Sequence, residues 1–204
     1  MILISDFIED WRAAALADEK LAPWAVTNDV VSLVRRAIEQ AGPDYRLSDA
    51  GAIHRTAHVE PGAIVKPPVF IGPEAFVAAT AYLRGGIVLL RKCIVGPACE
   101  LKSTVMFQEA KVAHLSFVGD SLIGARANIE AGAIVANYRN EMSDKTIRIK
   151  FGSRVIETGV EKFGAMIGDD ARIGANAVIA PGAFIDRNAA VARGGVVDQH
   201  PDAV

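Results

Sequence analysis

The sequence of 204 residues lacks the features that are typical of membrane, secreted and nucleic-acid-binding proteins. Although 51% of its residues are hydrophobic, no apolar run approaches the length needed to cross a bilayer. The N-terminus carries acidic residues where a signal peptide carries Lys or Arg. The formal net charge is −2, and basic clusters with interleaved aromatic residues are absent from the sequence. We therefore expect a soluble, cytoplasmic protein without a membrane or nucleic-acid partner.

Cysteine is also scarce, since the chain has only Cys93 and Cys99. Two cysteines supply neither a disulfide framework nor the four ligands of a structural zinc site. Both occupy positions that the repeat described below assigns to small, inward-facing side chains. We therefore predict that both are core residues, and not metal ligands or nucleophiles.

Residues 1–48 differ in pattern from the rest of the chain. Helically spaced apolar residues predict a short helix before Pro23, with Phe7, Ile8, Trp11 and Ala15 on one face. A clearer helix is predicted after the capping residues 27–29, with Val30, Val31, Val34, Ala37 and Ile38 on one face. Neither segment carries convergent polar groups. We expect residues 1–48 to form a small helical cap over an open end of the main domain, residues 49–204.

From residue 53 onward the apolar residues recur with a period of six. They are Ile53, Val59, Val65, Ile71, Val77, Leu83, Leu89, Val95, Leu101 and Phe107. Four positions after each of the first nine stands a small or branched residue: Ala57, Ala63, Val69, Ala75, Ala81, Ile87, Cys93, Cys99 and Val105. The same pattern returns at Ile167, Ile173, Ile179, Ile185, Val191 and Val197.

A period of six fits neither an amphipathic helix nor a hairpin strand. It is the hexapeptide signature of a parallel β-helix, in which each coil consists of three short strands. Such repeats resemble those of left-handed β-helices, an exception to the usual right-handed crossover. The sequence therefore predicts an all-β protein, a left-handed parallel β-helix with a small N-terminal helical cap.

Between the two regular runs the period changes phase. Met106, Val112 and Val118 continue one phase, whereas Phe117, Ile123, Ile129 and Val135 follow another. An irregular insertion at about residues 139–163 does not fit the period, and the alternation from Thr146 to Phe151 predicts a strand that leaves the coil. We place the candidate chemistry at the phase change, because the polar residues are concentrated there.

Two cations lie eighteen residues, or one coil, apart. Arg84 and Lys102 each follow an inward apolar residue, so they are expected on adjacent rungs about 4.8 Å apart. Like charges in this arrangement repel each other, which favours an anion such as phosphate between them. The alternatives are neutralisation by Glu100 and side chains that splay into water, and the residues alone do not choose between these readings.

His114 lies at the phase change among polar residues. An imidazole titrates near physiological pH and can accept a proton from an attacking amine. Glu109, Glu130 or a backbone carbonyl could orient it, and a purely structural role stays open. Asn128, Asn137 and Tyr138 supply uncharged polar groups nearby, although asparagine also suits left-handed corners.

Residues 84–138 carry a specific resemblance. Arg84, Lys102, the run Ala-His-Leu-Ser-Phe-Val-Gly-Asp from residue 113, and Asn137-Tyr138 resemble the acetyltransferase domain of the bacterial bifunctional N-acetylglucosamine-1-phosphate uridyltransferase/glucosamine-1-phosphate acetyltransferase. The wider group is that of the hexapeptide-repeat sugar acyltransferases. The resemblance implies His114 as general base, Arg84, Lys102, Phe117 and Asn128 as substrate-binding residues, and Ala131, Asn137, Tyr138, Ala175 and Arg193 as acetyl-CoA-binding residues.

The chain also departs from that family. Phe117 replaces a tyrosine, Ala175 replaces a serine, and Arg193 replaces a small residue. The segment after Tyr138 is longer, so Lys145 is only a candidate for the lysine that follows in the family. The first fifty residues lack a Gly-rich uridyltransferase loop, and we expect no pyrophosphorylase activity from this polypeptide.

The resemblance implies a homotrimer that transfers an acyl group, expected to be acetyl, from CoA to an amine on a sugar phosphate or nucleotide sugar. Backbone amides near Ala131 would support the oxyanion, and no metal is required. The alternative is a non-catalytic sugar-phosphate-binding or assembly protein on the same fold. A zinc enzyme is disfavoured, because His54, His58 and His200 are not expected to converge with His114 within one subunit.

Overall fold

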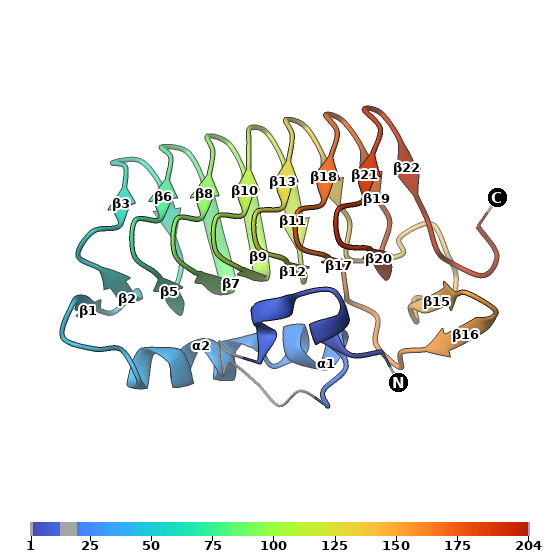
Figure 1. Cartoon of the computed structure of the whole chain (residues 1–204), viewed down its shortest axis with the longest axis horizontal. Coiled ribbons are helices and arrows are strands. Elements are labelled where there is room, and N and C mark those ends of the chain that lie inside the picture. Colours follow the sequence, from blue (N-terminus) through green and yellow to red (C-terminus); the bar gives the residue numbers. More distant parts are fainter. Residues whose placement is uncertain (1, 13–19, 204) are drawn as a thin grey trace.

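The computed structural model describes residues 2–12 and 20–203 (Figure 1). Two 3-10 helices, η1 (Ile4–Asp6) and η2 (Glu9–Trp11), stand where the first helix was predicted, and Ala15 falls outside the described residues. Two α-helices follow, α1 (Pro23–Asn28) and α2 (Val30–Glu39). Pro23 begins α1 instead of interrupting a helix, because proline suits the first helical position. None of the helices in the described ranges is long and apolar enough to span a membrane.

The rest of the chain winds into a solenoid of about eight turns with three faces. The seven-stranded face consists of β3 (His58–Val59), β6 (Phe76–Val77), β8 (Ile94–Val95), β10 (Lys111–Val112), β13 (Asn128–Ile129), β18 (Arg172–Ile173) and β21 (Ala190–Val191). A thirteen-stranded sheet forms the other two faces and bends around the corner between them.

The first of these, the cavity face, contains β4 (Ile64–Val65), β11 (Phe117–Gly119), β14 (Ile134–Val135), β19 (Val178–Ile179) and β22 (Val196–Val197). The second, the helix face, contains β2 (Gly51–His54), β5 (Val69–Ile71), β12 (Leu122–Ile123), β17 (Ala165–Ile167) and β20 (Ala183–Ile185). β7 (Tyr82–Leu89) and β9 (Glu100–Met106) run through both faces, and β1 (Tyr45–Ser48) pairs antiparallel with β2. All other solenoid pairs are parallel, which confirms the predicted parallel β-helix.

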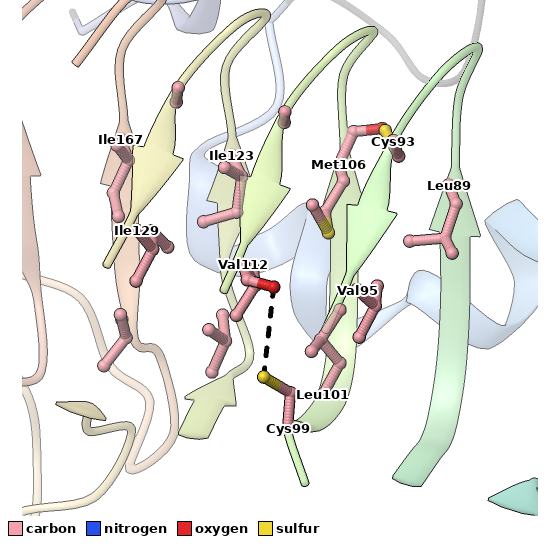
Figure 2. Close-up of a cluster of buried hydrophobic side chains, with 14 of the residues drawn as sticks. Leu89, Cys93, Val95, Cys99, Leu101, Met106, Val112, Ile123, Ile129 and Ile167 are labelled. Carbon is pink, nitrogen blue, oxygen red and sulfur yellow. Dashed lines mark hydrogen bonds between the residues drawn. The ribbon is translucent and has the colours of Figure 1, made fainter. Parts of the chain in front are cut away.

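The interior of the solenoid is filled by the two rows that the sequence pattern predicted. Large aliphatic residues alternate with small ones within each coil, and large residues stack in rows along successive coils, as Leu89, Met106, Ile123 and Ile167 do (Figure 2). Cys93 and Cys99 belong to the small row and are at most 1% exposed, so the prediction that they are core residues is confirmed. Burial raises the pKa of Cys93 to about 12, which keeps this thiol protonated and unreactive.

Two assignments in the repeat are wrong. The inward position after Leu101 is Met106 and not Phe107, because β9 is one residue shorter than its neighbour β7. A second five-residue step leads from Val118 to Ile123. As a result, Val105 and Phe107 lie outside the coil, where Phe107 packs against Trp11 with ring centroids 6.0 Å apart.

The N-terminal helices do not cover an open end of the solenoid. They lie along the helix face, where they bury a second apolar cluster that includes Val30, Leu33, Val88 and Leu122 (Figure 1). The position of the N-terminal helices has a physical cause. The outward residues of β7, β9 and β12 on this face are apolar, so this side of the coil needs a cover.

The segment outside the period contains an antiparallel hairpin, β15 (Arg148–Phe151) and β16 (Arg154–Glu157). The hairpin is attached to the C-terminal tail, since the amide of Lys150 donates to the carbonyl of Gln199 at 2.6 Å and Arg148 pairs with Asp202 at 2.8 Å. Ile147 and Ile149 are fully buried in the same cluster as the helices. The insertion therefore packs back onto the solenoid.

Candidate active site

Arg84 and Lys102 occupy adjacent rungs, as the eighteen-residue spacing predicted. They pair directly across β7 and β9 on the cavity face, just before the chain turns the corner. The turn in β7 is an irregularity at Gly85 and Gly86, both with positive φ. A side chain at Gly86 would meet Val30 and Val31 of α2 at 3.0–3.3 Å, so glycine lets the helix approach the corner.

Each of the two cations already has a carboxylate partner. Arg84 Nη2 lies 2.6 Å from Glu100 Oε1, and Lys102 Nζ lies 2.6 Å from Asp120 Oδ2. Neutralisation by Glu100, one of the alternatives that the sequence leaves open, therefore occurs at Arg84. The partnership of Lys102 with Asp120 was not anticipated. Repulsion between the cations is therefore balanced by these carboxylates without a bound anion.

A cavity of about 460 Å³ opens beside these cations. Its lining consists of Arg84, Lys102, Phe117, Asn137, Tyr138, Glu161 and Lys162. Five of the ten residues that the resemblance singled out therefore share one cavity. Glu161 and Lys162 come from the end of the insertion, which sequence reasoning did not place.

Asp120 organises the floor of this site. Its side chain is only 6% exposed and accepts hydrogen bonds from Lys102 Nζ and from the amide of Asn137. Its backbone adds two bonds, to the carbonyl of Lys102 at 2.7 Å and from the amide of Gly164 at 2.9 Å. One buried carboxylate thus fixes side chains from β9 and from the segment after β14. The Gly119-Asp120 pair at the phase change was the signal that could have found it.

His114 lies at the corner between β10 and β11. The residue is exposed, and its imidazole has no hydrogen bond to any part of the chain that the structure describes. Neither predicted orienting carboxylate serves it, since Glu109 pairs with Arg91 and Glu130 with Arg193. His114 does not line the cavity with the two cations. It is open to a ligand or to a neighbouring molecule from outside.

Four of the predicted residues stack along this corner. The amides of Gly132, Asn176 and Gly194 donate to the carbonyls of His114, Ala131 and Ala175, at 2.8, 2.9 and 2.8 Å respectively. This ladder places His114, Ala131, Ala175 and Arg193 at one position of four successive coils. They form a row, which we call the corner row, that runs from the imidazole toward the C-terminal end of the solenoid.

Asn128 faces a different cavity, on the seven-stranded face. It shares a space of about 270 Å³ with Glu130, Arg172 and Arg193. Glu130 accepts two hydrogen bonds from Arg193, both at 3.0 Å, and a third from the amide of Ala175 at 2.8 Å. These bonds hold the pKa of Glu130 below its ordinary value and raise that of Arg193. Within one subunit the predicted residues therefore fall into two groups on two faces, with His114 between them.

Of the two lysines Lys145 and Lys162, only Lys162 is among the described residues that line the cavity. Lys145 Nζ donates to the carbonyls of Asn140 and Met142 and lies 5.5 Å from the ring centre of Tyr138. The described residues contain no group of three or more His, Cys, Asp or Glu side chains that could hold a metal ion.

The hexapeptide period, the parallel coils and the small inward row define the class, that of hexapeptide-repeat β-helix proteins. No protein-family model matches the chain. It is 32% identical over 153 residues to a bifunctional sugar-1-phosphate nucleotidylyltransferase/acetyltransferase of Sulfurisphaera tokodaii, which is 75% of this chain and 37% of that protein. It is 35% identical over 162 residues to the bifunctional protein GlmU of Pseudarthrobacter chlorophenolicus, which is 78% of this chain and 31% of that protein.

Among solved structures, a hexapeptide transferase family protein of Anaplasma phagocytophilum superposes with a TM-score of 0.41 and 14% identity, over 72% of this chain and 80% of that chain. The chain spans only about a third of the length of the two bifunctional relatives. It is homologous to these proteins, and the part that it covers is their acetyltransferase part.

Proposed function

We propose that the protein transfers an acyl group, acetyl from acetyl-CoA, to the amine of an amino-sugar phosphate or nucleotide sugar. The proposal rests on the cavity, whose lining includes Arg84, Lys102, Asn137 and Tyr138. The exposed His114 lies at the corner of the coil just before β11, the strand that supplies Phe117 to the same lining. The similarity to a bifunctional sugar-1-phosphate nucleotidylyltransferase/acetyltransferase supports the same chemistry.

The cavity suits the anionic end of such a substrate. Arg84, Lys102 and Lys162 bring three positive charges to its lining, against one carboxylate, Glu161. A phosphate would accept hydrogen bonds from the guanidinium and the ammonium groups on the side away from Glu100 and Asp120. Those two carboxylates then act as positioning groups, since they fix where the cations point before the substrate arrives. Phe117 provides an apolar wall beside the sugar.

His114 acts as the general base. The amine nitrogen attacks the thioester carbonyl, a carbon–nitrogen bond forms, and the imidazole takes a proton from that nitrogen. The tetrahedral intermediate then collapses as the carbon–sulfur bond breaks, and the imidazolium returns the proton to the departing CoA thiolate. The step needs no metal ion. An exposed imidazole without an internal partner can be oriented by the substrate or by an adjacent subunit.

CoA binds along the corner row. Ala131 and Ala175 have small side chains that leave room along this edge, and Arg193 adds a positive charge at its far end. Asn137 and Tyr138 position the thioester, and Asn128 contacts the sugar from the seven-stranded face. The paired side chains of Glu130 and Arg193 occupy part of this corner. CoA would therefore either separate the pair or bind beside it.

A homotrimer would bring the two groups of residues together. The cavity face presents a row of three exposed apolar residues in direct register, Ile134, Val178 and Val196, which are 37, 38 and 69% exposed. Apolar rows of this kind are typical of surfaces that associate. Packing this face against the corner row of another copy would enclose one site between two subunits.

A thiol-release assay with acetyl-CoA and a panel of amino-sugar phosphates and nucleotide amino sugars tests the proposal. The aromatic disulfide used to detect free CoA will not react quickly with the native protein, because Cys93 and Cys99 are at most 1% exposed. We expect amine-dependent thiol release with at least one phosphorylated amino sugar. Release of thiol that does not depend on the amine would contradict an N-acyltransferase.

The second candidate function is sugar-phosphate binding without turnover. Two observations favour it: Phe117 lacks a hydroxyl, and both cations already have carboxylate partners. Saturable binding of a sugar phosphate by calorimetry, without thiol release from acetyl-CoA for any amine, would establish this alternative.

A further inference from the structure

A cavity of about 520 Å³ lies between the N-terminal helical segment and the β15–β16 hairpin. None of its described lining residues lines the candidate active site, and its volume is larger than that of the cavity there. Its apolar wall includes Ile2, Trp24, Phe151 and Ile156, and two cations, Lys20 and Arg154, stand at its lining. A cavity of this size lies in the range of small-molecule binding sites.

The aromatic walls of this cavity are held from behind. The indole of Trp24 makes an edge-on contact with Phe163, with ring centroids 6.0 Å apart. Phe151 makes an edge-on contact with Phe184 at 5.7 Å and a tilted contact with Phe7 at 6.5 Å. Each ring therefore packs against the apolar cluster of the helix face, and its position is fixed without a ligand. A preformed apolar slot loses less ordering entropy on binding than a flexible surface does.

The charged residues among the described lining of the cavity have one sign. Among the described residues that line it there is no carboxylate, whereas Arg154 and Lys20 are positive. The Arg154 side chain is exposed and makes no hydrogen bond or ion pair with the described part of the chain. By contrast, the guanidinium groups of Arg126, Arg139 and Arg187 each form an ion pair with a carboxylate. Arg154 is therefore available for an anion from solution.

We propose that this cavity is a second ligand site that binds a small anion carrying a flat apolar group, such as an aromatic carboxylate. Trp24 and Phe151 flank the ring of the ligand, and Arg154 pairs with its carboxylate. This site goes beyond the proposed acyl transfer, because its residues belong to the helix α1 and the hairpin and not to the cavity face.

Titration calorimetry of the full chain with 2-naphthoate tests the site. We expect saturable binding with a Kd at or below about 1 mM, and binding of 2-naphthylmethylammonium at least about tenfold weaker, because a cationic group cannot pair with Arg154. Arg154→Gln should weaken naphthoate binding about fivefold or more. Arg35→Gln is the matched control, since Arg35 is an exposed arginine of α2 outside the cavity, and it should leave the Kd unchanged.

A second variant separates the aromatic contribution from the charge. Trp24→Leu should weaken the binding of both naphthyl compounds, and the melting temperature of this variant shows whether it still folds. Arg154 is on the surface, so its variant keeps the test valid even if Trp24→Leu does not fold. The proposal is overturned by the absence of binding, by equal affinity for the ammonium compound, or by equal effects of Arg154→Gln and Arg35→Gln. Binding lost in Arg84→Gln but kept in Arg154→Gln would assign the anion to the candidate active site and would also overturn it.

Discussion

Asp120 shows how one residue sets the geometry of the candidate site. Its buried carboxylate accepts hydrogen bonds from Lys102 on the preceding coil and from Asn137 on the following coil. Its backbone carbonyl accepts a further hydrogen bond from the amide of Gly164, directly before β17. The Lys102 ammonium is itself only 18% exposed. If the carboxylate were lost, a partly buried positive charge would stay without its partner, which costs more than the pair contributes.

Asp120→Asn is therefore expected to lower the free energy of unfolding by about 1–3 kcal/mol, measured by denaturant unfolding at a fixed protein concentration. The matched control is Asp170→Asn, which breaks the Arg126–Asp170 pair, whose side chains are 47% and 40% exposed. An exposed pair contributes about 0–1 kcal/mol, so the control should be nearly neutral. Equal losses in the two variants would mean that Asp120 is an ordinary surface carboxylate.

Arg84→Gln tests the anion end of the site. Arg84 lines the cavity and its side chain is 36% exposed, so it can reach a bound phosphate without refolding. We expect the KM for the sugar phosphate to rise about tenfold while kcat changes by less than about threefold, because the lost contact is present in both ground and transition states. Arg91→Gln, which removes an arginine outside the cavity, should change neither constant. An unchanged KM in Arg84→Gln would remove Arg84 from substrate binding.

At the level of elements, the insertion is attached to the tail by a buried ion pair. Arg139, which follows Tyr138 directly, is 1% exposed and contacts both oxygens of Asp198 at 2.6–2.7 Å and the carbonyl of Pro181 at 2.9 Å. Arg139 thereby lowers the pKa of the Asp198 carboxyl below its ordinary value of 3.8. The pair holds the chain as it leaves the cavity, so it positions Tyr138.

The stability that this pair provides should depend on pH in a defined direction. Because the folded-state pKa of Asp198 is lowered, its contribution is complete above about pH 4 and is lost as the pH falls through the folded value. Asp198→Asn should reduce stability by about 3–5 kcal/mol at neutral pH, because it leaves the buried Arg139 with only Glu141, an exposed carboxylate at 3.4 Å. The difference in melting temperature between native protein and variant should shrink below about pH 4. A difference that stays constant with pH would contradict the pair's assigned role.

The strands were predictable from the sequence because each coil repeats the same local constraint. Every sixth residue must fill the interior, and the small residue four positions later must leave room for it. The two shortened steps were not predictable, since Met106 and Phe107 are both large and apolar and either could face inward. Only the helices decide between them, because they provide Trp11 as an outside partner for Phe107. The same contacts explain why the helical segment lies along the coil and not over its end.

On the scale of the whole molecule, the arrangement of the faces predicts association. The cavity face carries an exposed apolar row along three coils, and the candidate residues are divided between this face and the next. We expect light scattering of the native protein to give the mass of a trimer of 21.6 kDa subunits.

Ile134→Glu places a charge in that row and should convert the trimer to smaller species and abolish the activity. Val155→Glu is the control, because Val155 is 52% exposed but lies on the hairpin, away from the row. Trimeric Ile134→Glu protein would show that the apolar row is not the contact surface.

The candidate site was predictable in part, for reasons of distance along the chain. Arg84 and Lys102 are one coil apart, so the repeat alone places them on adjacent rungs. Glu161 and Lys162 were missed because the insertion folds back through contacts that no period describes. The corner row also depends on coil lengths that change at the two short steps, so its alignment follows only from the backbone hydrogen bonds.

We propose that His114 and the cavity lined by Arg84 and Lys102 together carry out N-acyl transfer. The most direct test is mass spectrometry of the amino-sugar product formed from ¹³C-acetyl-CoA by native protein and by His114→Ala. We predict a labelled N-acetyl product from the native protein and a rate at least about 100-fold lower from the variant, with little change in melting temperature because His114 is exposed. A native protein that forms no labelled product with any phosphorylated amino sugar, or a variant that keeps most of the rate, would contradict the claim.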